Sequence, residues 1–270
     1  MDHHVRPDLG QRTPLAGVAV TGAPVGGASA ALAQTPQRPR RIFVLVHGAW
    51  HGGWCWRRLS DRLTAAGHLV FTPTLTGVGE RVHLLNPNIN LDTHIADIVS
   101  VMKWEDLTDV VLCGHSYAGC VITGVAEKME SAISSIVYLD AFMPENGQAL
   151  SDLMPPEHGA AIVKAAQEGQ ALPARSAAAF AVNEKDRAWV DAKCTPHPAG
   201  TFAQKVVTTG ARDRIGKKAY VLAEGYPGPF RPLRDKLAAT PGWRTYELPC
   251  GHDIMVDIPD RLAEILQEVA

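Results

Sequence analysis

Hydrophobic residues along this chain gather in short continuous runs, and amphipathic segments separate the runs. Runs of four to eight β-branched and apolar residues between turn residues are typical of strands that are buried on both faces of a sheet. We expect such strands at residues 42–47, 69–75, 110–113, 133–142, 219–223 and 243–248.

Helical periodicity occupies the intervals between these runs, with Asp92 as the expected N-cap of its helix. The alternation of strands and helices predicts an α/β fold, with a mostly parallel sheet and helices on both faces. The expected helices are at residues 54–66, 92–104, 120–129, 231–239 and 259–269.

A long interval at about residues 145–216 shows no strand pattern and contains three helical stretches, 156–169, 185–194 and 202–209. It is too long for a plain loop. We therefore expect a helical lid insertion that covers the functional site.

Residues 1–40 differ in composition from the rest and show no convincing helix or strand pattern. A weakly apolar stretch that ends at Ala31-Leu32-Ala33 is typical of an export leader. Glycine and proline interrupt that stretch, so a disordered extension fits equally well. We expect the folded domain at residues 41–270. The location would be periplasmic or secreted if residues 1–33 are an export leader, and cytoplasmic otherwise.

Composition narrows the class of partner. The 270 residues are 46% hydrophobic with a net charge of -2, which suits one domain with a large core. The absence of a basic cluster argues against nucleic-acid binding, and no run approaches the roughly 18 apolar residues of a membrane span. Five scattered cysteines favour neither a disulfide framework nor a zinc site. We expect a small-molecule partner and no metal, nucleic acid or membrane, with a homodimer left open.

The run that starts at Val110 leads into Gly114-His115-Ser116-Tyr117-Ala118-Gly119 and then into a helical segment. A strand, a sharp turn with a central serine and a helix form the context of a nucleophile elbow. Small residues are needed around the serine because the two backbones pass close together. The spacing departs slightly from G-x-S-x-G, since the second glycine stands one place late. An ordinary strand-to-helix turn with a capping serine is the alternative interpretation.

Serine needs a base to accept its proton, and His252 stands in a turn just beyond the last strand. Functional groups gather at the carboxyl ends of parallel strands, so this histidine and Ser116 share one edge of the sheet. Acyl transfer also requires N–H donors for the oxyanion, for which the backbones of Ala49 and Tyr117 are the candidates. We interpret His47 as a structural residue of the first loop and His115 as a packing residue beneath the elbow.

Four segments carry a family resemblance: residues 47–54, the Gly-His-Ser elbow, residues 137–144 and Gly251-His252. Together they resemble the α/β-hydrolase branch that contains plant methylesterases, hydroxynitrile lyases and related bacterial esterases. The resemblance covers roughly residues 41–145 and 217–270 and implies the α/β-hydrolase fold. Hydroxynitrile lyases of that branch carry a threonine and a lysine where this chain has Gly48 and Asp253, so the resemblance favours an ester hydrolase.

The catalytic acid is where this chain departs from the branch. The resemblance places an aspartate after the strand that follows the insertion, and this chain has Tyr226 there, with Glu224 nearby. The alternative is Asp140, at the end of the strand that follows the elbow helix, where some lipases and haloalkane dehalogenases place their acid. A carboxylate at the end of an apolar strand is costly without a partner. We prefer Asp140 and keep Glu224 as the alternative.

These residues predict a serine carboxylesterase without a cofactor, in which Ser116, His252 and Asp140 act together. The alternatives are an amide, carbamate or lactone hydrolase, a hydroxynitrile-lyase-like enzyme, or a non-catalytic ligand-binding protein on the same scaffold. Aromatic residues of the first loop and the insertion, such as Phe180, favour apolar or aromatic substrates of small to medium size. The expected substrate-binding residues are Trp50, Trp54, Phe142 and Trp189.

Overall fold

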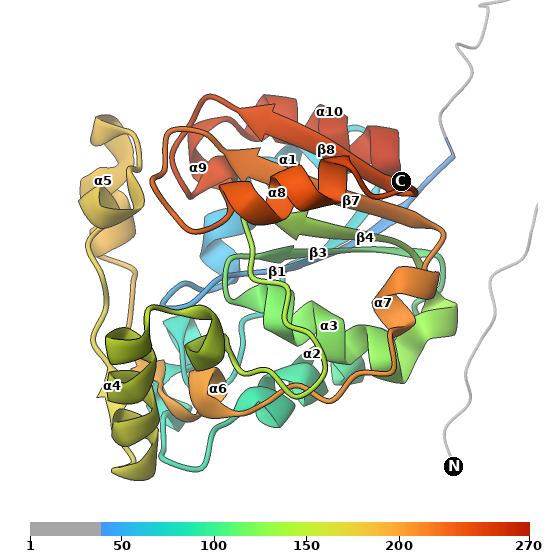
Figure 1. Cartoon of the computed structure of the whole chain (residues 1–270). Coiled ribbons are helices and arrows are strands. Elements are labelled where there is room, and N and C mark those ends of the chain that lie inside the picture. The colour runs from blue at the N-terminus through green and yellow to red at the C-terminus, as the bar shows by residue number, and fades with distance from the viewer. Residues whose placement is uncertain (1–38) are drawn as a thin grey trace, which may run out of the picture. The chain divides into compact units, whose positions relative to one another are not determined.

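The structure is a computed structural model that describes residues 39–270. The extension expected at residues 1–40 lies outside the described residues, apart from Pro39 and Arg40. Within the described part, six parallel strands form one sheet in the order β2-β1-β3-β4-β7-β8 (Figure 1). These strands are β1 (Ile42–Val46), β2 (Leu69–Phe71), β3 (Val110–His115), β4 (Ile133–Leu139), β7 (Lys217–Ala223) and β8 (Trp243–Leu248).

The central strands are buried on both faces of the sheet. In β1, Val44 and Val46 pack into one apolar cluster, whereas Phe43 and Leu45 pack into a second cluster on the opposite face. This alternation follows from the two-residue period of a strand. Both faces therefore need covering helices, which explains why the strand sequences are continuously apolar.

Helices cover the two faces in separate groups. The first cluster receives α2 (Leu91–Trp104), α3 (Ala118–Met129) and α8 (Arg231–Ala238), and the second receives α1 (Arg57–Ala65), α9 (Ile254–Asp257) and α10 (Pro259–Val269). Figure 1 shows α1 and α10 on one side of the sheet and α2 and α3 on the other. The fold class predicted from the sequence, a parallel sheet between helices, is confirmed.

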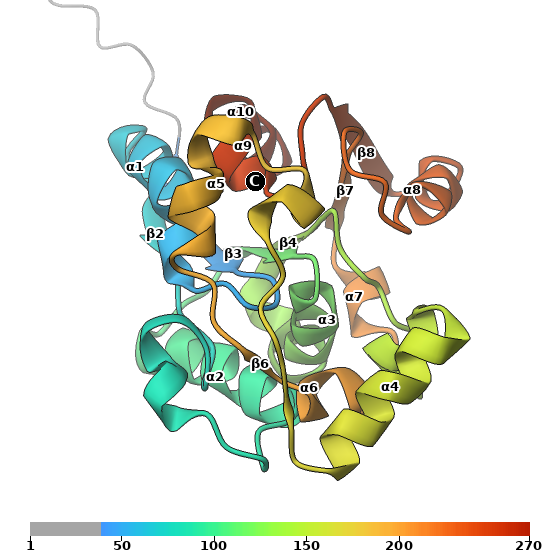
Figure 2. The ribbon, with the colours of Figure 1, turned by 90° about the vertical axis from the view of Figure 1, so that its left-hand side faces the viewer.

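The insertion joins β4 to β7, which are neighbours in the sheet. Figure 2 looks towards the carboxyl ends of the strands, and the chain from α4 to α5 runs across these ends. In addition to the 3-10 turns η4 (Leu150–Leu153) and η5 (Ala177–Phe180), the insertion contains α4 (Pro156–Gln167), α5 (Glu184–Asp191), α6 (Gly200–Ala203) and α7 (Ala211–Arg214).

Three local expectations were wrong. The insertion does contain strands, because β5 (Ala171–Leu172) pairs antiparallel with β6 (His197–Pro198). The helix expected at 202–209 is only the single turn α6, which ends at Ala203. The N-cap of α2 is Asn90 instead of Asp92, since the Asn90 side chain accepts a hydrogen bond from the Thr93 N–H in a capping box.

Candidate active site

Ser116 stands in a strained turn directly after β3. Its backbone has φ +55°, a left-handed conformation that residues other than glycine rarely adopt. The Ser116 N–H donates to the carbonyl of Leu139, and the Ser116 carbonyl accepts from the N–H groups of Gly119 and Phe142. The bonds with Leu139 and Phe142 tie the turn to the end of β4, and the bond from Gly119 joins it to the start of α3. Together they hold the strained conformation in place, as a nucleophile elbow would require.

The glycines around the turn have a steric role. A Cβ added to Gly119 would lie 1.8 Å from the Phe142 carbonyl oxygen, and one added to Gly114 would lie 2.8 Å from that of Ala118. Because those contacts are with backbone atoms, no rotamer change could relieve them. The late position of the second glycine is therefore required here by the chain that leaves β4.

The structure brings Asp140 to His252. Asp140 follows β4, is fully buried, and its Oδ2 lies 2.6 Å from His252 Nδ1. Its Oδ1 accepts a hydrogen bond from the Ala223 N–H, and its own N–H donates to Val221, so β7 fixes this carboxylate. With Nδ1–H donated to a carboxylate, Nε2 of His252 carries the lone pair that a general base needs.

Glu224, the alternative acid, lies elsewhere. Its side chain is 42% exposed, and its carboxylate pairs with Arg231 at 3.6 Å. Of the two carboxylates considered from the sequence, Asp140 is the one in contact with the histidine.

The backbone of His252 is also held at both ends. Its N–H donates to the carbonyl of Phe180, which belongs to the insertion. Its carbonyl oxygen accepts a hydrogen bond from Nε2 of His115, 3.0 Å away. Burial lowers the pKa of His115 well below its usual range, so this ring is neutral. His115 thus packs beneath the elbow and also fixes the turn that carries His252.

The loop after β1 passes directly over Ser116. A Cβ added to Gly48 would lie 2.8 Å from His115 Nδ1 and 3.0 Å from the Cβ of Ser116, so a larger residue at this position would crowd the elbow. Within residues 39–270, neither the Ala49 N–H nor the Tyr117 N–H donates to a protein acceptor. Both residues are almost completely buried. These two N–H groups are the donors that the sequence suggested for an oxyanion.

His47 stabilises this loop from within. Its Nδ1 donates to the Gly48 carbonyl, and its Nε2 accepts from the Leu75 N–H. Burial lowers the pKa of His47 to about 3, in agreement with a neutral ring that donates at one nitrogen and accepts at the other. This matches the structural role that the sequence suggested.

The four expected substrate-binding residues fall into two places. Phe142 packs against the ring of Phe230, and Trp50 packs against Phe180. Trp54 and Trp189 instead pack against each other, with ring centroids 5.0 Å apart. The Arg58 guanidinium lies over the Trp189 ring, which places this pair between α1 and α5.

Three aromatic rings surround His252 and form what we call the aromatic wall: Phe180, Tyr226 and Phe230. Their centroids lie 5.6, 4.4 and 5.6 Å from that of the histidine ring. From the sequence, Phe180 was expected as one of the aromatic residues of the insertion. Tyr226 stood out only because it occupies the position where the branch usually has its catalytic acid. No sequence pattern indicated Phe230, which precedes α8.

Between residues 39 and 270, no three or more histidine, cysteine or acidic side chains are grouped so that they could hold a metal ion. Over the same residues, no helix is long and apolar enough to cross a membrane.

Comparison with known proteins connects this geometry to a family. Residues 43–265 match the model of the alpha/beta hydrolase family. A carbendazim hydrolyzing esterase from Nocardioides sp. (strain SG-4G) is 45% identical over an alignment of 238 residues, which covers 83% of this chain and 97% of that protein.

Solved structures agree on the fold. An extracellular alpha/beta-hydrolase from a Paenibacillus species, described as a structural and functional homologue of tobacco salicylic acid binding protein 2, superposes with a TM-score of 0.73. It is 24% identical, and the match covers 85% of this chain and 99% of that one. The methylesterase MES16 from Arabidopsis superposes with a TM-score of 0.65 at 22% identity, covering 84% of this chain and 98% of that one.

Proposed function

This chain belongs to the alpha/beta hydrolase family, and we propose that it is a serine hydrolase that cleaves carboxylic esters through an acyl-enzyme. The observation that carries this proposal is the buried hydrogen bond between Asp140 and His252, at the same edge of the sheet as a serine held in a left-handed turn. The similarity to an esterase over almost the whole length of that relative supports the same reaction class.

In this mechanism, Ser116 Oγ attacks the ester carbonyl while His252 Nε2 takes its proton. Asp140 keeps the proton of the histidine on Nδ1 and stabilises the imidazolium that forms. The developing oxyanion is bound by the N–H groups of Ala49 and Tyr117, which have no protein acceptor of their own. His252 then protonates the leaving alcohol, and water, activated by the same histidine, releases the acid and restores the serine.

The aromatic wall supports a substrate with an apolar or aromatic group of small to medium size. Phe180, Tyr226 and Phe230 approach His252 from the insertion and from the chain around the start of α8. Planar rings favour planar ligands, because offset stacking and the burial of apolar area both contribute to binding.

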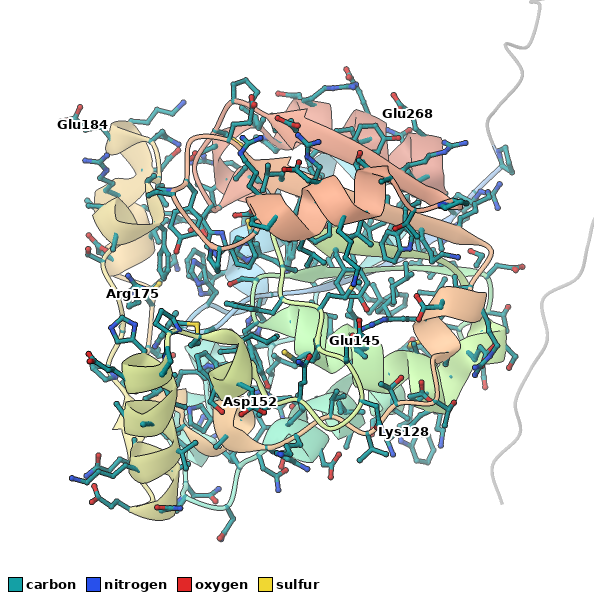
Figure 3. All side chains as sticks on the ribbon, viewed as in Figure 1. Lys128, Glu145, Asp152, Arg175, Glu184 and Glu268 are labelled. Atoms are coloured by element: carbon teal, nitrogen blue, oxygen red, sulfur yellow. The ribbon has the colours of Figure 1, made fainter. Side chains whose placement is uncertain are left out.

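We propose that the insertion is a lid over this site. Phe180 of the insertion contacts the His252 ring and accepts the backbone hydrogen bond of that residue. Arg175, whose guanidinium lies over the Phe180 ring, lies with Glu184 at the edge of the molecule formed by the insertion (Figure 3). Opening of the insertion would therefore expose His252 and its aromatic neighbours together.

Hydrolysis of a carbamate is the second candidate reaction, because the Nocardioides esterase that matches over almost its whole length is named for hydrolysis of carbendazim. Carbendazim is a carbamate ester on a planar benzimidazole. The same residues would expel its alcohol to form a carbamoyl-enzyme, and water would then release a carbamic acid, which loses CO₂ to leave the amine. The benzimidazole ring system also suits the aromatic wall. Amide or lactone hydrolysis would use the same residues, with a different leaving group.

A hydroxynitrile-lyase-like activity is disfavoured by the residue after His252. Asp253 is a fully buried carboxylate that is bonded to His51, so its side chain is a buried anion where the lyases carry a lysine. A ligand-binding protein without catalysis would have no need for a strained serine at the same edge of the sheet as a hydrogen-bonded histidine–aspartate pair.

A fluorophosphonate probe tests the nucleophile. We expect the wild-type protein to be labelled and Ser116→Ala to escape labelling completely. Ser135→Ala is the matched control, since this buried serine in β4 has a hydroxyl without a partner. Equal labelling of Ser116→Ala and wild type would reject the proposal.

A substrate panel separates the two candidate reactions. Aryl acetates, aryl benzoates and carbendazim should be compared by kcat/KM with the same enzyme preparation. Faster turnover of simple esters supports the carboxylesterase, whereas a preference for carbendazim identifies a carbamate hydrolase. If the protein hydrolyses none of these compounds and the fluorophosphonate probe does not label it, a binding role is favoured.

A further inference from the structure

The peptide group between Ala49 and Trp50 is held at both ends by buried histidines. The Ala49 carbonyl accepts a hydrogen bond from His51 Nδ1 at 2.8 Å, and the Trp50 N–H donates to His197 Nδ1 at 3.3 Å. Trp50 itself has φ +65°, a strained value for this residue type. Its carbonyl accepts from the Thr195 N–H, so the insertion holds Trp50 on both sides.

His51 carries a positive charge in this arrangement. Its Nδ1 faces the Ala49 carbonyl and its Nε2 lies 2.9 Å from Asp253 Oδ2, so both nitrogens face acceptors and both must donate. Burial opposes the charge on His51, but the Asp253 carboxylate outweighs it and raises the pKa of His51 well above its usual range. Burial also opposes ionisation of Asp253, yet His51 lowers the pKa of that carboxyl to about 2.

An ion pair in this position is a poor choice for stability alone. Both side chains are buried, and Oδ1 of Asp253 has no hydrogen-bond partner. Removing two charges from water generally costs as much as their attraction returns, and apolar residues of similar size would often do better. The pair does connect two parts of the site, because Asp253 follows His252, and His51 belongs to the first loop and donates to its Ala49 carbonyl.

His197 approaches the same peptide from the insertion. Its Nδ1 accepts from Trp50, so its proton is on Nε2 and is donated to Thr201 Oγ1, 2.9 Å away. The Thr201 hydroxyl donates in turn to the Pro198 carbonyl. Burial lowers the pKa of His197 well below its usual range, which keeps the ring neutral and able to accept.

We infer that His51 and His197 are positioning residues of the oxyanion site. They fix the Ala49–Trp50 peptide, and His47 holds the carbonyl of the adjoining Gly48–Ala49 peptide, so Ala49 between them is held on both sides and its N–H points towards the substrate carbonyl above Ser116. This inference rests on the proposed function. Asp253 keeps His51 in the orientation that donates to Ala49. A donor contributes to catalysis only if it is aimed before charge develops, and a strained loop without these bonds would relax away from that direction.

The test for His197 uses two variants that differ in one acceptor. In His197→Phe, the Trp50 N–H loses its acceptor, and we expect kcat to fall by about tenfold with KM within about twofold. His197→Asn retains an acceptor oxygen near the place of Nδ1 and should recover part of that loss. A purely structural role would lower the melting temperature of both variants without separating kcat from KM.

The test for His51 must avoid leaving an unpaired buried charge. His51→Phe is therefore made in an Asp253→Asn background and compared with Asp253→Asn alone. We expect His51→Phe to lower kcat by about a further tenfold, because a phenyl ring cannot donate to the Ala49 carbonyl. If this double variant does not fold, the His197 pair decides the question.

Affinity for benzeneboronic acid provides a second readout, because its tetrahedral adduct with Ser116 occupies the oxyanion site. The inhibition constant should rise in parallel with the loss of kcat in His197→Phe and in the double variant. Asp186→Asn is the matched control, since this buried carboxylate is hydrogen-bonded to Arg58 and Asn183 and to neither His51 nor His197. It should lower the melting temperature and leave boronate affinity unchanged.

The possible failures are distinguishable. A wild-type protein that neither hydrolyses esters nor binds the boronate would overturn the proposed function itself. A wild-type protein that does both, with His197→Phe and the double variant unchanged in kcat and boronate affinity, would overturn only the positioning roles. An equal loss of boronate affinity in Asp186→Asn would also overturn them, since the effect would then be a general loss of stability.

Discussion

Asp140 Oδ2 lies 2.6 Å from His252 Nδ1, although 112 positions separate the two residues and the strands that carry them are not neighbours in the sheet. Asp140 follows β4 and His252 follows β8, with β7 between them. Asp140 spans that gap because its carboxylate and its N–H are both bonded to β7, at Ala223 and Val221.

Replacing Asp140 by asparagine should keep the fold and lower kcat by up to about 10⁴. The amide can turn an N–H donor towards Nδ1, which favours the wrong tautomer of the histidine, and it carries no charge to stabilise the imidazolium. Steady-state kinetics on an aryl ester, with circular dichroism to verify folding, measures this effect.

Glu224→Gln is the control for that prediction. Its carboxylate is partly exposed and paired with Arg231, so kcat should stay within about threefold of wild type. The reverse ranking of the two variants would transfer the acid role to Glu224.

Substrate preference should depend on the aromatic wall more than on the Trp54–Trp189 pair. Tyr226→Ala should raise KM for aryl esters by about tenfold relative to small alkyl esters, because it removes a stacking surface beside His252. Trp189→Ala should lower the melting temperature and change rates uniformly across the panel. A selective change in Trp189→Ala together with an unchanged profile in Tyr226→Ala would show that the substrate lies on the other side of the first loop.

The space around two glycines predicts different effects of alanine substitution on stability. Gly119→Ala should destabilise the protein by about 3 kcal/mol, because the new Cβ would overlap the Phe142 carbonyl and neither backbone can move freely. Gly216→Ala meets no atom within 4 Å and should change stability by less than about 1 kcal/mol. Urea denaturation of both variants checks the difference.

Acid should destabilise the fold through its buried neutral histidines. Burial lowers the pKa of His47 to about 3 and that of His94 to about 4, while an unfolded histidine titrates near about 6.5. Between these values the unfolded chain binds protons that the folded chain excludes. Each such histidine therefore removes about 1.4 kcal/mol of unfolding free energy per pH unit as the pH falls from about 6 to about 4.5.

The pKa shift of His51 has the opposite sign to those of His47 and His94, so it does not alter the slope of stability between about pH 6 and about pH 4.5. Its pKa is raised in the fold, so it is protonated in both states below pH 6 and its contribution is lost only as the pH rises. Urea denaturation of wild type and His94→Gln at several pH values measures the slopes. The slope of His94→Gln should be smaller by about one proton, and an identical slope would show that His94 titrates normally in the folded protein.

The sequence by itself determined the elements and the local chemistry. Apolar runs and helical periodicity report interactions within a few residues, so the central strands β1, β3 and β4 and the final helix α10 could be placed from them. The elbow around Ser116 could also be predicted, since a turn of small residues between a strand and a helix is a local sequence pattern. Chain order then placed His252 at the same edge of the sheet.

Tertiary structure alone decided which groups meet at that edge. The choice between Asp140 and Glu224 depends on strand order and register, which bring the end of β4 across β7 to the turn after β8. The aromatic wall and the His51–Asp253 pair likewise join segments that are far apart in the chain. No local pattern encodes such contacts, because burial and hydrogen bonding between distant segments are settled only when the whole sheet has packed.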